Sequence, residues 1–71
     1  MTDSKPPSVR LVERVLEEIG PATLSEIVDE SGLPRSTARW ALRRLRARGT
    51  VESRPRPGDA REQLHARNDR P

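Results

Sequence analysis

The chain has 71 residues, no cysteine and one histidine, which excludes a disulfide and any ordinary zinc site. It carries 14 Lys and Arg against 11 Asp and Glu, and it has no run of about eighteen apolar residues that would span a membrane. This length predicts one small domain, and its core must be aliphatic because Trp40 is the only aromatic residue.

The charge is divided unevenly along the chain. Residues 1–34 carry three basic and seven acidic side chains, net −4, whereas residues 35–71 carry eleven basic and four acidic, net +7. Six of these arginines lie in the stretch 35–48. In a small domain, such a density of arginine indicates an anionic partner, most commonly nucleic acid.

The first predicted element is an amphipathic helix. Residues 1–7 are expected to form a flexible arm, because the Pro6-Pro7 pair opposes helix formation. Ser8 is suited to cap the helix that follows, and Gly20 ends it. Apolar residues recur at the spacing of one helix face, which is expected to lie in the core: Val12, Val15, Leu16 and Ile19.

Two further helices are predicted around a tight turn. Thr23 and Glu26 have the spacing of a capping box, which predicts a short helix over about 24–30. Residues 31–34 include a glycine and form the turn, and a third helix is predicted over 34–48. Its core residues share one face: Ala38, Ala41, Leu42 and Leu45.

The last predicted element is a β-hairpin. Residues 50–54 contain a β-branched pair, and a turn rich in Pro and Gly follows. The second strand is expected over 60–67, with Leu64 and Ala66 facing inward. His65 is expected to be exposed, and it is assigned no role.

Together these elements predict a mainly α-helical fold with a small β-hairpin. The arrangement is a winged helix-turn-helix, with three helices plus a two-stranded wing. The domain is expected to cover residues 8–67, and residues 68–71 are expected to be a flexible tail.

Several segments resemble bacterial winged helix-turn-helix regulators. Leu33-Pro34-Arg35-Ser36-Thr37 is similar to the Leu-Pro-Lys-Ser-Thr start of the recognition helix in IclR-type regulators. Gly49-Thr50-Val51-Glu52 is similar to the Gly-Leu-Val-Glu exit of MarR-type regulators. Residues 54–61 resemble their arginine-rich wing, with Pro-Gly-Asp at its tip. The resemblance covers about residues 8–67 and implies a DNA-binding module.

The third helix carries the expected DNA contacts on the side away from its core. Arg43 or Arg44 is suited to donate two hydrogen bonds to a guanine, and hydroxyls near the helix start are suited to phosphate or base edges. Trp40 is expected to pack on a thymine methyl or sugar, or alternatively at a protein interface. The resemblance implies base reading for the corresponding helix positions. The expected contacts are Arg35, Ser36, Thr37, Arg39, Trp40, Arg43 and Arg44.

The remaining arginines are less clearly placed relative to DNA. In the wing, Arg54, Arg56 and Arg61 are expected to reach the minor groove or its phosphates, with a solvated hairpin tip as the alternative. Arg46 and Arg48 lie nearer the core edge and the helix C-terminus. They are expected to complement the helix dipole rather than to touch DNA.

The predicted function is sequence-specific binding of double-stranded DNA by a transcriptional regulator. Helix 34–48 is expected in the major groove and wing 54–61 on the adjacent minor groove or backbone, with two copies forming a homodimer on a two-fold symmetric site. The alternatives are a protein-interaction module that uses the acidic half or Trp40, and an RNA-binding or architectural protein.

Several classes of partner and activity are not expected from the sequence. No Gly-rich phosphate loop, cysteine nucleophile or histidine–carboxylate set is present, so an enzyme is not expected. No metal, cofactor, small-molecule ligand or membrane contact is expected either. The expected location is cytoplasmic, on the nucleoid.

Overall fold

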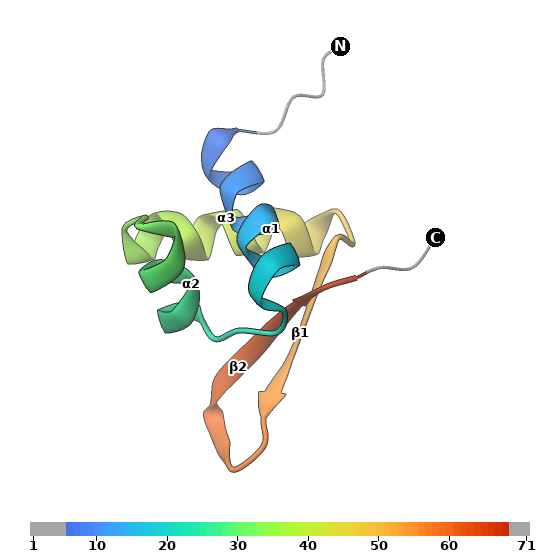
Figure 1. Cartoon of the computed structure of the whole chain (residues 1–71). Helices are drawn as coiled ribbons and strands as arrows, with labels where there is room; N and C mark the ends of the chain where they lie inside the picture. The colour runs from blue at the N-terminus through green and yellow to red at the C-terminus, as the bar shows by residue number, and fades with distance from the viewer. Residues whose placement is uncertain (1–5, 69–71) are drawn as a thin grey trace.

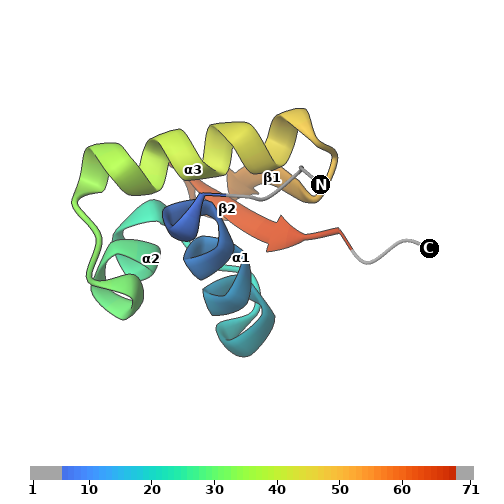
Figure 2. The same ribbon diagram turned by 90° about the horizontal axis from the view of Figure 1, so that it is seen from above.

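The computed structural model describes residues 6–68, which form three helices followed by a two-stranded antiparallel hairpin (Figure 1). The elements are α1 (Pro7–Ile19), α2 (Leu24–Ser31), α3 (Arg35–Ala47), β1 (Val51–Arg56) and β2 (Asp59–Arg67). In the view of Figure 2, α1 and α2 lie on the same side of α3; in Figure 1 the hairpin extends away from the helices. The predicted winged helix-turn-helix is confirmed. Residues 1–5 of the expected arm and 69–71 of the expected tail lie outside the described residues.

The helix starts differ slightly from the prediction. α1 begins at Pro7 with Pro6 as its N-cap, so Ser8 is inside the helix and does not cap it. Proline suits the first position because its missing N–H would have no partner inside the helix. α3 begins at Arg35, with Pro34 as the N-cap rather than the first helical residue.

The predicted capping box of α2 is confirmed. The backbone N–H of Thr23 donates to Oε1 of Glu26 at 2.8 Å, and the backbone N–H of Glu26 donates to Oγ1 of Thr23 at 3.2 Å. Gly32 follows α2 with a φ of 74°, a left-handed conformation that glycine adopts without the usual strain. These features fix where α2 begins and ends.

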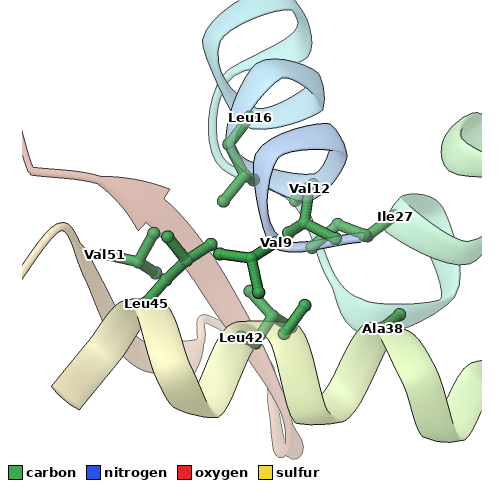
Figure 3. Packing of buried hydrophobic residues seen from close by; sticks show 10 residues of the cluster. Val9, Val12, Leu16, Ile27, Ala38, Leu42, Leu45 and Val51 are labelled. Carbon is green, nitrogen blue, oxygen red and sulfur yellow. The ribbon is translucent and has the colours of Figure 1, made fainter. Parts of the chain in front are cut away.

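The core is aliphatic and lies between α1, α2 and α3, with one residue from β1 (Figure 3). The predicted seam of α3 is fully enclosed, and Val9 extends the buried face of α1 by one turn beyond the prediction. Ile19, at the other end of that face, is 40% exposed. The buried cluster comprises Val9, Val12, Leu16, Ala22, Ile27, Ala38, Ala41, Leu42, Leu45 and Val51.

The hairpin strands are longer than predicted, and different residues of β2 face the core. β1 and β2 pair from Val51 and Arg67 down to Arg56 and Asp59, so only residues 57–58 form the turn. The buried residue of β2 is His65, at 7% exposure, which corrects two expectations. Because strand residues alternate between faces, a buried His65 leaves its two neighbours on the other face, where they are only half-buried.

The predicted inward pair, Leu64 and Ala66, is therefore wrong, and so is the exposed position predicted for His65. The cause is an isolated β-bridge between His65 and Ala22 that the sequence did not reveal. The N–H of Ala22 donates to the carbonyl of His65 at 3.0 Å, and the N–H of His65 donates back at 2.8 Å. This bridge joins the hairpin at His65 to the segment between α1 and α2, and His65 is buried there.

A candidate nucleic-acid interface

α3 carries arginines on two separate edges of its outward side. At about 100° per residue, Arg35, Arg39 and Arg46 fall on one edge, next to Leu42 of the buried seam. Trp40 and Arg44 fall on the other edge. All five side chains are exposed, and between the two edges Ser36, Arg43 and Ala47 are exposed as well. The helix therefore presents a broad surface of arginine and small side chains to solvent.

The second edge is built around Trp40. Its side chain is 41% exposed, in agreement with its predicted place away from the core. The guanidinium carbon of Arg44 lies 5.1 Å from the centre of the indole ring, a distance suited to a cation–π contact. This contact holds a flat, positively charged pair on the surface of α3.

The first edge lines a groove of about 330 Å³ between α2, α3 and β2. Four arginines line it, three from α3 and one from the wing: Arg35, Arg39, Arg46 and Arg61. Nη2 of Arg35 donates to Oγ of Ser25 in α2 at 3.0 Å, which fixes one guanidinium without neutralising its charge. Arg46 was not among the expected DNA contacts. The helical wheel already places it beside Arg39, so its position on this edge of α3 could have been predicted.

His65 also lines this groove, at its buried side. Its Nδ1 lies 2.7 Å from Oγ of Ser53, which also accepts a hydrogen bond of 3.4 Å from Nη1 of Arg46. Burial lowers the pKa of His65 below its ordinary value, and the positive charge of Arg46 lowers it further. The ring is therefore neutral near pH 7.

The wing separates its three predicted arginines. Arg61 lines the groove, whereas Arg54 and Arg56 lie outside it. Nη1 of Arg56 lies 2.9 Å from Oε1 of Glu62, an ion pair that is about half exposed on each side. The structure thus brings Arg61 together with the arginines of α3, whereas the other two are exposed on β1 and do not line the groove.

Ion pairs join the end of β2 that lies next to the helices to α1. Arg67 lies 3.6 Å from the carboxylate of Glu13 and 3.2 Å from that of Glu17. In the α1–α2 half, exposed acidic residues face solvent at Glu18, Asp29 and Glu30. α3 itself carries five arginines and no acidic residue, which leaves its exposed side strongly positive.

Within residues 6–68, no group of three or more His, Cys, Asp or Glu side chains is arranged to hold a metal ion. None of the three helices described is long and apolar enough to cross a membrane.

Comparison with known proteins identifies the family. The profile of the IclR helix-turn-helix domain matches residues 8–55, more than half of the chain. No curated protein matches the chain in sequence.

Solved structures share the fold over nearly the whole chain. The chain is similar to Bordetella bronchiseptica BpsR, whose DNA binding is regulated by 6-hydroxynicotinic acid, at 26% identity and a TM-score of 0.85, covering 97% of this chain and 53% of that one. It is similar to the transcriptional regulator PcaV of Streptomyces coelicolor at 26% identity and a TM-score of 0.82, covering 93% and 46%. The zinc-responsive MarR family member ZitR of Lactococcus lactis shares the fold at 14% identity and a TM-score of 0.83, covering 97% and 47%.

The chain spans about half the length of these structures. The capping box of α2 and the whole of α3 lie within the matched residues 8–55. The chain therefore belongs to the IclR helix-turn-helix domain family and has the fold of a DNA-binding transcriptional regulator.

Proposed function

We propose that this chain binds double-stranded DNA in a sequence-specific manner, with α3 in the major groove and the wing on the adjacent minor groove or backbone. The observation that carries the proposal is the outward side of α3, which exposes arginines on both edges and has no acidic residue between 35 and 48. An α-helix fits the major groove of DNA, where guanine presents two acceptors to one guanidinium group.

The proposal assigns a role to each predicted contact on α3. Arg43 and Ser36 lie in the middle of the exposed side of α3 and are the proposed base readers. Trp40 and Arg44 present the stacked pair to sugar or a thymine methyl. Arg35 and Arg39 are the proposed contacts to phosphates that flank the major groove. Thr37 is half-buried and lies near the start of α3, where backbone N–H groups favour phosphate.

The wing arginines extend the proposed contact to the neighbouring backbone. Arg54 is exposed with no ion pair among the described residues, so its full charge is available to the minor groove. Arg56 is shared with Glu62, which weakens its expected contribution. The unit that binds is the domain over residues 8–67.

We also propose that two copies bind a two-fold symmetric site, because a single small module buries little surface on DNA. Exposed apolar residues on α1, Leu11 and Ile19, are the candidate contact between copies. Analytical sedimentation of the protein with a duplex that it binds specifically measures the number of chains per duplex. Two chains per duplex support it, and one chain per duplex on a site without symmetry contradicts it.

The experiment that tests sequence-specific binding is selection from a pool of random duplexes. A shared motif in the bound fraction, about one helical turn between its halves, is the expected result. Equal binding of all sequences would instead indicate an architectural protein, and absence of duplex binding at low salt would favour a protein-interaction module.

A further inference from the structure

We propose that the groove between α2, α3 and β2 is a built binding site for a phosphate group, carried by the DNA backbone or free in solution. The DNA-borne form rests on the proposed function, whereas the binding of free phosphate does not. Titration with inorganic phosphate and titration with a short duplex, both described below, separate these cases.

The first argument is the charge of the lining. Arg35, Arg39 and Arg46 approach from α3, and Arg61 approaches from β2 across the groove. The one carboxylate in the lining, Glu62, is already paired with Arg56 at 2.9 Å. Four guanidinium groups therefore share a space of about 330 Å³ without a carboxylate of their own, which favours an oxyanion with several acceptor oxygens, such as a phosphate.

The second argument is that neutral groups already hold this lining in position. The hydroxyl of Ser25 accepts from Arg35 at 3.0 Å, and the hydroxyl of Ser53 accepts from Arg46 at 3.4 Å. These bonds orient the guanidinium groups but leave their charge uncompensated. A phosphate with several acceptor oxygens is suited to accept from more than one of them.

The third argument concerns His65, which lines the same groove. Ser53 of β1 faces the ring, and Arg46 of α3 contacts the same hydroxyl. The other charged residues that line the groove near it are Arg61 and Glu62, earlier in β2, and the Thr23 segment lies before α2. A bound phosphate offsets the charge of Arg46 and so favours the protonated ring. Binding of phosphate is therefore coupled to uptake of a proton by His65.

The chain offers two single-residue probes for the test, since it has one histidine and one tryptophan. His65 lines the groove, whereas Trp40 lies on the opposite edge of α3 and does not line it. We would follow the NMR signal of the His65 ring against pH with increasing inorganic phosphate, at an ionic strength held constant with potassium chloride. A saturable shift at millimolar phosphate and a rise in the pKa of His65 are expected.

The matched variants are Arg46→Gln and Arg10→Gln, each of which removes one exposed arginine charge. Arg46→Gln is expected to weaken phosphate binding several-fold, whereas Arg10→Gln, on α1 and away from the groove, leaves it unchanged. Arg61→Gln gives the same test from the wing, where a helix cannot be disturbed. A response that does not saturate, or one of equal affinity in all variants, would overturn the site.

A second titration uses a short duplex in place of phosphate. If the duplex and free phosphate both move the His65 signal and compete, the groove takes either source. If only the duplex moves it, and Arg46→Gln abolishes that shift, the groove holds a DNA phosphate. If neither moves it, the inference fails, even where Trp40 fluorescence shows that DNA binds. If phosphate moves His65 but the duplex moves neither probe, the site stands and the proposed function fails.

Discussion

His65 lies directly opposite Ser53 in the pairing of β1 with β2, and the Nδ1 and Oγ atoms of the two side chains are 2.7 Å apart. The Ser53 oxygen also accepts from Arg46 of α3, so its proton is free for the neutral ring. One hydroxyl thus links both strands of the wing to α3. Burial and the nearby charge of Arg46 disfavour the protonated ring, which makes the proton equilibrium of His65 relevant to the stability of the wing.

Stability is expected to fall as the pH drops below about 6.5. The pKa of His65 is lower in the folded state than the ordinary 6.5, so the unfolded chain binds more protons in this window. The stabilisation is therefore complete above the unfolded pKa and is lost as the pH falls through the folded pKa. Urea unfolding between pH 8 and pH 5 measures the slope, which for one group is at most about 1.4 kcal/mol per pH unit.

The control for this prediction is His65→Asn, which keeps a polar side chain but does not titrate. The variant is expected to lose overall stability and to flatten the pH dependence between pH 7 and pH 5. An unchanged slope in His65→Asn would assign the effect to other groups.

Leu45→Ala is expected to destabilise the fold by about 2–5 kcal/mol, because a fully buried side chain leaves a cavity between α1, α3 and β1. A domain of this length has a total stability of roughly 4–10 kcal/mol, so much of the variant should be unfolded. Circular dichroism during urea denaturation measures the loss. The control Arg10→Ala, at an exposed site of α1, should change stability by about 0.5 kcal/mol or less.

Thr23→Ala is expected to cost about 0.5–2 kcal/mol, since it removes the acceptor for the Glu26 N–H at the start of α2. Thr23→Ser keeps that oxygen and should cost much less, as should Glu26→Gln, which preserves the reciprocal bond. Thermal unfolding of the three variants side by side tests this. Equal losses for Ser and Ala at residue 23 would show that burial of the threonine methyl, and not the cap, stabilises α2.

Arg43→Ala is expected to lower DNA affinity by about 1–3 kcal/mol and to relax the preference at one base pair, because Arg43 lies at the centre of the exposed side of α3. Competition binding with single-base variants of the selected site provides the measurement. Arg10→Ala, on α1, serves as the control for loss of charge. If affinity for all sequences falls equally, Arg43 contacts phosphate and the base-reading role is wrong.

Local patterns in the sequence were sufficient to predict the helices. The α3 seam follows from helical spacing, and the capping box of α2 follows from a hydroxyl and a carboxylate three residues apart, which are short-range interactions. The exposure of Trp40 follows from the same helical wheel. For these elements, the buried side of each helix is fixed by its own residues.

The wing was predicted less well because its inward face is fixed by a distant segment. Alternation alone favoured Leu64 and Ala66 as buried, yet the bridge to Ala22 encloses His65 instead. The groove was likewise hidden, since it needs Arg61 of β2 to approach α3. Arg46 alone could have been found, because it lies beside Arg39 on the helical wheel.

The central claim is that the outward side of α3 binds DNA, and Trp40 fluorescence during titration with a mixed-sequence duplex tests it most directly. We predict a spectral change that saturates, with an affinity that falls by orders of magnitude as salt rises, because arginines release counterions from the phosphates. No spectral change at low salt, together with no mobility shift of the duplex, would contradict the claim.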